Sequence, residues 1–172
     1  MKLGLAQRLA VIGVTIAIGS SYGVVTRKDL LSSVSPNPSD FVTLFLLIFL
    51  TAALIDFLSS IPIFGLLIMG AATRSFGAVW GVILLDHSSS NPFPLFLITV
   101  FEVTASVMAG LASFRLIDLL DSRKAHEQFS LSGKRHLRAY LKLLGLALII
   151  RFFSALFESA SILGMLPFGL AS

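Results

Sequence analysis

Residues 41–85 read FVTLFLLIFLTAALIDFLSSIPIFGLLIMGAATRSFGAVWGVILL, and this stretch decides the fold class. It is almost entirely apolar and far longer than the about 20 residues that one membrane-crossing helix needs. It is interrupted once, between Ser59 and Pro62, where two serines and a proline favour a tight turn. The stretch therefore predicts two antiparallel membrane helices, 42–60 and 62–85.

Similar apolar runs lie on both sides of this pair, and they are long enough for three further membrane helices. The whole chain, residues 1–172, is therefore interpreted as a single integral membrane domain. Its predicted fold class is all-α, a polytopic transmembrane helical bundle of about five spans. A polar break at 86–92 separates the third span from the fourth. The five predicted spans are 9–26, 42–60, 62–85, 93–118 and 139–164.

Two parts of this topology have an alternative. The first span follows Lys2 and Arg8 and resembles a signal peptide, and we interpret it as a retained, uncleaved helix. The alternative for the second and third spans is a single pass followed by a re-entrant pair, broken near Gly70 and Arg74.

The composition supports the membrane assignment and excludes other classes. Apolar residues make up 56% of the chain and charged residues 13%, whereas soluble domains have about 45–50% and roughly 25%. These values exclude a disordered chain and, despite the net charge of +4, a nucleic-acid-binding domain. Because the chain has no cysteine and three scattered histidines, we predict no metal ligands, no cofactor and no catalytic residues, and hence no enzyme.

The basic residues predict the orientation. They concentrate in the connection 119–138, and the positive-inside rule places such a loop in the cytoplasm. Counting spans back gives a cytoplasmic N-terminus in the cell membrane. We expect the loop to contact anionic lipid headgroups or a cytoplasmic partner. The residues predicted for this contact are Arg123, Lys124, Lys134, Arg135 and Arg138.

Charged residues within the predicted spans are the candidate functional residues, because each costs about 2.5–3.5 kcal/mol at the centre of a lone membrane helix. By the helical rise, Arg74 and Arg151 lie about 18 Å below the outer ends of their spans and Glu102 roughly 14 Å. We therefore predict that Arg74 or Arg151 pairs with Glu102. The predicted intramembrane charge network comprises Asp56, Arg74, Glu102, Arg151 and Glu158.

Two members of this set differ from the rest. Asp56 lies near the cytoplasmic end of the second span, where we expect it to be partly solvated. Glu158 lies two turns beyond Arg151 on the same face, and it is the better candidate for titration or for contact with a partner. The whole set is interpreted as a salt-bridge network that holds the helices in register. The alternative is an ion or proton relay, or a polar pocket for a substrate.

Small side chains repeat on the helical faces that carry these charges, and small residues let membrane helices approach closely. We therefore predict a tightly packed core formed by the third, fourth and fifth spans. Similar but weaker patterns occur in the first span. The predicted packing residues are Gly70, Gly77, Gly81, Ala105 and Ala109.

Two further motifs lie in the last two spans. Residues 101–110 (FEVTASVMAG) place a glutamate ahead of small residues and an Ala-Gly pair, and Ala155 to Glu158 form an Ala-x-x-Glu pattern near the end of the last span. In both motifs the chain resembles the stage II sporulation protein M family of prokaryotic membrane proteins. It departs from the family at 97–99, where Leu-Ile-Thr replaces Pro-His-Gly. The resemblance implies a multi-pass, non-enzymatic membrane protein that works in complexes.

Taken together, these features predict a structural or assembly subunit of a larger membrane complex. Its expected partners are membrane lipids and other membrane subunits or further copies of the chain, with no nucleic acid among them. An aromatic surface on the last span, Phe152, Phe153 and Phe157, is expected to face lipid or such a subunit. The alternative is a small transporter or channel component that uses the buried Glu and Arg residues.

Overall fold

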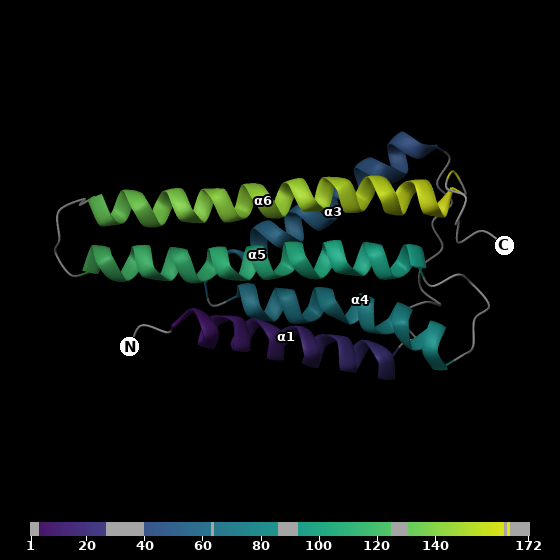
Figure 1. The fold of residues 1–172 in the computed structure, drawn as a ribbon, viewed down its shortest axis with the longest axis horizontal. Coiled ribbons are helices and arrows are strands. Elements are labelled where there is room, and N and C mark those ends of the chain that lie inside the picture. The colour runs from purple at the N-terminus through teal and green to yellow at the C-terminus, as the bar shows by residue number, and fades with distance from the viewer. Residues whose placement is uncertain are drawn as a thin grey trace.

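The computed structural model describes residues 4–26, 40–62, 64–85, 93–124, 131–163 and 165, with residues 82–85, 122–124 and 131–132 described by their backbone alone. Within these residues the chain forms five α-helices and no strand, so the prediction of an all-α helical bundle is confirmed. Figure 1 shows α6, α5, α4 and α1 lying side by side, with α3 running obliquely across α5 and α6. The helices are α1 (Leu5–Val25), α3 (Phe41–Ser59), α4 (Gly65–Leu85), α5 (Phe93–Lys124) and α6 (Leu131–Ile162).

The predicted break between the second and third spans is a tight turn. Helix α3 ends at Ser59, and α4 begins at Gly65, whose N–H donates to the carbonyl of Ile61 at 2.9 Å. Helix α4 continues without interruption past Gly70 and Arg74. The re-entrant alternative is therefore wrong, because those residues interrupt the apolar pattern without breaking the backbone hydrogen bonds.

Helix α1 packs along α4 through glycines on both helices. A Cβ atom added at Gly19 would overlap the backbone of Gly70, and one added at Gly77 would overlap the backbone of Ser20. The two backbones approach this closely because a glycine without a side chain stands at each of these points of contact. Gly70 and Gly77 are thus packing residues as predicted, but they face α1. The prediction that the third span packs into a core with the fourth and fifth spans through these glycines is therefore wrong. The small-residue pattern of the first span, which was interpreted as weaker, forms the contact with α4.

Helices α5 and α6 form a long antiparallel hairpin with a small-residue interface. Ala105 and Ala109 on α5 are 0% exposed, as is Ala147 on α6. Each helix has 32 residues and is therefore about 48 Å long, against a hydrocarbon layer of about 30 Å. The pair projects beyond α1 and α4 at one end (Figure 1), which we call the basic end. The opposite end, where α1 and α6 end, we call the far end.

The predicted cytoplasmic loop 119–138 is largely helical. Helix α5 continues to Lys124 and α6 begins at Leu131, so only residues 125–130 of this connection lie outside the described residues. Loss of hydrophobicity marks the limit of a membrane layer but does not end a helix, since Leu, Arg, Lys and Ala all favour helix in water. The predicted limits of the loop are therefore not the ends of the two helices.

Candidate functional site

The guanidinium of Arg151, on α6, lies at the centre of a buried ionic network. Its Nε donates to Oδ2 of Asp56 at 2.7 Å, and its Nη2 donates to Oδ1 of the same carboxylate at 3.1 Å. The two side chains are 3% and 1% exposed. This two-point contact between a planar guanidinium and a carboxylate is the strongest form of the ion pair, and it joins α6 to α3.

The same guanidinium also contacts α5. Its Nη2 donates to Oγ of Ser106 at 3.1 Å, and its Nη1 lies 3.1 Å from Oε1 of Glu102. Glu102 and Ser106 are four residues apart, so they share one face of α5. One arginine therefore holds α3, α5 and α6 together, through hydrogen bonds to Asp56 and Ser106 and an ion pair with Glu102. The prediction that Glu102 pairs with an intramembrane arginine is confirmed for Arg151.

The burial of Asp56 contradicts one prediction, which was made from the depth of this residue in its span. It was expected to be partly solvated near a helix end, but it is 1% exposed. The last turn of α3, which carries Asp56, lies against the middle of α6, because α6 extends well past α3 at the basic end. Counting residues from the end of each span assumes that all helices end in one plane, and these do not.

Arg74 lies apart from this network. Its Nε donates to Oγ1 of Thr26 at 3.0 Å, and its guanidinium carbon is 4.7 Å from the centre of the Tyr22 ring. Both partners belong to the end of α1. Among the described residues Arg74 makes no ion pair.

Glu158 and Ser154 extend the network along α6 toward the far end. Glu158 is partly buried and close enough to Arg151 and Glu102 to interact electrostatically with both, but it makes no ion pair within the described part of the chain. Between Arg151 and Glu158, Ser154 is 2% exposed, and its Oγ has no hydrogen-bond partner in the part of the chain that the structure describes. Three carboxylates thus surround one guanidinium. Among the described residues no group of acidic or histidine side chains is arranged to hold a metal ion.

A second ion-pair cluster, which the sequence analysis missed, lies nearer the basic end. Nη1 and Nη2 of Arg8 donate to the two carboxylate oxygens of Asp118, each at 2.8 Å. Arg115 Nη1 lies 3.6 Å from the same carboxylate and His136 Nδ1 lies 4.0 Å from it. The cluster ties α1 to α5 and α6. Its signal in the sequence was the Arg115–Asp118 spacing of one helical turn at the end of a span.

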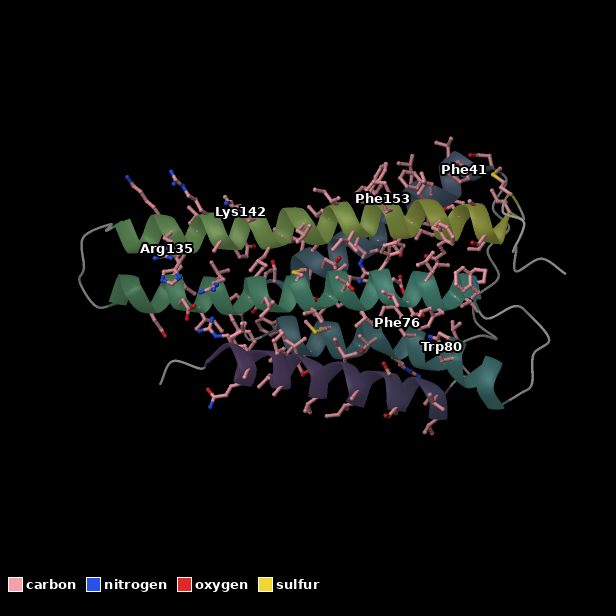
Figure 2. The ribbon with its side chains drawn as sticks, in the orientation of Figure 1. Phe41, Phe76, Trp80, Arg135, Lys142 and Phe153 are labelled. Atoms are coloured by element: carbon pink, nitrogen blue, oxygen red, sulfur yellow. The ribbon has the colours of Figure 1, made fainter. Side chains whose placement is uncertain are left out.

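Basic side chains also line one face of α6 at the basic end. They border an open recess of about 580 Å³ whose lining residues are Lys134, Arg135, Arg138, Ala139 and Lys142. Figure 2 shows Arg135 and Lys142 on the part of α6 that lies toward the basic end. The predicted contacts Arg123 and Lys124 belong to the end of α5, and their side chains lie outside the described residues.

Of the predicted packing residues, Gly81 on α4 is buried.

Four of the helices, α1, α3, α5 and α6, are long and apolar enough to cross a membrane. Together with charges that are paired inside the bundle, they define a multi-pass α-helical integral membrane protein. No family model, no curated protein and no solved structure matches the chain.

Proposed function

We propose that this protein is a structural or assembly subunit of a larger membrane complex. The observation that carries the proposal is the engagement of Arg151, a buried charge whose donors are directed at Asp56, Glu102 and Ser106 of the protein itself. A substrate site would keep such donors available. Here they fix the relative positions of three helices, as expected of a network that sets helix register.

The lateral surface supports a role in contacts within the membrane. Leu47 and Leu54 on α3 are 59% and 58% exposed, and Phe153 on α6 is 53% exposed. The expected aromatic surface is shared with α3, because the ring of Phe152 lies 5.3 Å from that of Phe45. The resemblance to the stage II sporulation protein M family also implies a protein that works in complexes.

The orientation belongs to the same proposal. With α4 as a fifth span, the basic end carries Arg115, Lys134, Arg135 and Arg138, and the positive-inside rule places this end and the N-terminus in the cytoplasm of the cell. Its basic face then meets anionic headgroups or an acidic partner. Because the chain has no cysteine, single cysteines at Ser89 and Ser130 test the orientation, and they are expected to label from opposite sides.

Purification in a native-like lipid environment tests the function. We expect the protein to be isolated with further membrane subunits or further copies of itself, at a fixed stoichiometry measured by native mass spectrometry. A strictly monomeric protein without co-purifying subunits would overturn the proposal.

One observation favours a second function, that of a small transporter or channel component. Glu158 lacks an ion pair among the described residues, Ser154 lacks a hydrogen-bond partner, and Glu102 is 17% exposed, so one side of the network is not closed. Intramembrane charges of this kind often mark ion or proton paths. Ion flux into liposomes that is lost in Glu102→Gln would support this function in place of the first.

A further inference from the structure

Two opposite charges within the bundle have no partner of opposite charge in the described part of the chain. Among the described residues, the guanidinium of Arg74 contacts a hydroxyl and an aromatic ring but no carboxylate, and Glu158 makes no ion pair. Each is only partly buried, so each is open to approach from outside. Protonation can remove the charge of a glutamate, but an arginine in a protein stays charged, so Arg74 requires a counter-charge from elsewhere.

The two charges lie at the same end of the bundle. Glu158 is four residues before Ile162, where α6 ends, and is therefore about 6 Å from that end. The guanidinium of Arg74 is hydrogen-bonded to Thr26, the residue that caps the end of α1. Figure 1 shows that α1 and α6 both end at the far end, with α1 stopping slightly short of α6. Both charges thus lie in the part of the bundle toward the far end: the guanidinium of Arg74 is level with the end of α1, and Glu158 is about 6 Å from the end of α6.

They nevertheless cannot meet within one chain. In Figure 1, α5 lies between α6, which carries Glu158, and α4, which carries Arg74 and packs against α1. Arg74 is held on the α1 edge by Thr26 and Tyr22. Glu158 lies on α6, close enough to Arg151 and Glu102 to interact electrostatically with both.

We propose that a second copy of this chain supplies the missing partner, with Arg74 of one copy pairing with Glu158 of the next. The inference rests on the proposed function and names the partner. Such a contact gives Arg74 a carboxylate and adds a second guanidinium to a network of three carboxylates and one arginine.

The contact joins two different surfaces of the protein. Contacts of this type repeat from copy to copy and close into a ring, whereas a symmetric dimer uses the same surface twice. The assembly therefore buries one α1–α4 edge against one α6 edge at each contact, and we expect more than two copies in the closed form.

Cysteine cross-linking tests the contact in the otherwise unaltered chain. Ser75, next to Arg74, is exposed on α4, and Ile162, one turn beyond Glu158, is 37% exposed. When Ser75→Cys and Ile162→Cys proteins are mixed in lipid and oxidised, they are expected to cross-link to each other. Leu137→Cys is the matched control, since it lies on the same helix with the same exposure but near the basic end, and it is expected not to cross-link to Ser75→Cys.

Charge substitutions test the chemistry. Arg74→Gln and Glu158→Gln, each verified as folded by thermal unfolding, are expected to weaken self-association about tenfold or more. Arg74→Glu combined with Glu158→Arg in the same chain is expected to restore part of it, while Asp121→Asn, which neutralises an exposed carboxylate near the basic end, is expected to change nothing. Cross-linking that is absent while other subunits co-purify would overturn this inference and leave the proposed function standing. A lone monomer would overturn both.

Discussion

The two arginine–aspartate pairs of this bundle have the same local geometry and different surroundings. Arg151 and Asp56 are 3% and 1% exposed in the middle of the bundle, whereas Arg8 and Asp118 are both 11% exposed nearer the basic end. In the first cluster several carboxylates share one guanidinium, and in the second one carboxylate is shared among Arg8, Arg115 and His136.

The position of an ion pair in the bundle sets how much it contributes to stability. A charge enclosed among apolar helices cannot exchange its partner for water, so losing that partner leaves the full desolvation cost uncompensated. A partly exposed charge at the basic end can turn to water, headgroups or another arginine. Bond lengths that differ by only a few tenths of an ångström therefore correspond to different contributions to stability.

The largest expected effect follows removal of the central cation. Arg151→Met leaves Asp56 and Glu102 facing each other without a counter-charge, and we expect a loss of about 3–5 kcal/mol in the free energy of unfolding. Unfolding in mixed micelles measures it. Adding Asp56→Asn to Arg151→Met is expected to recover part of the loss, because one stranded charge is then removed. A loss smaller than that caused by removing the Arg8–Asp118 ion pair would contradict the assigned difference between the two pairs.

A smaller effect is expected at Glu102. Glu102→Gln removes one contact of Arg151 and leaves its two-point contact with Asp56 intact, so we expect a loss of about 1–2 kcal/mol. A double-mutant cycle with Arg151→Met measures the coupling between these two residues directly. Additive losses would show that Glu102 does not contribute to the network, contrary to the 3.1 Å contact.

The pair near the basic end is expected to contribute about 1 kcal/mol or less. Asp118→Asn removes the partner of Arg8, whose side chain remains close to water and to the ring of Phe114. High salt is expected to reduce the effect of this substitution and to leave that of Arg151→Met unchanged, since salt screens accessible charges only. Equal salt dependence of the two substitutions would contradict the assigned difference in surroundings.

The smallest effect on the isolated chain is expected at Arg74. Arg74→Gln removes one hydrogen bond to Thr26 and a cation–π contact with Tyr22, so the free energy of unfolding of the monomer is expected to fall by less than about 1 kcal/mol. Any larger consequence should then be seen only in the assembled state. A monomer strongly destabilised by this substitution would show that Arg74 has a structural role within one chain.

The sequence by itself determined the helical membrane class, the turn between α3 and α4, and the pairing of Glu102 with an intramembrane arginine. Each of these follows from local chemistry: a long apolar run needs a membrane, a proline with serines ends a helix, and a charge within that run needs a partner. Asp56, Glu102 and Arg151 were recognised as candidates because each is a charged residue within a long apolar run. Asp118 passed unnoticed because it lies among other charges.

Only the tertiary structure decided which charges meet. Asp56 and Arg151 are 95 residues apart in the chain, and their contact depends on the oblique crossing of α3 over a helix that extends past it. Arg74 was predicted at the depth of Arg151 but lies against α1, level with the end of that helix, because glycines on α1 and α4 bring those two backbones together. Depth along a helix is a property of the sequence, whereas rotation and tilt depend on the packing of all the helices at once.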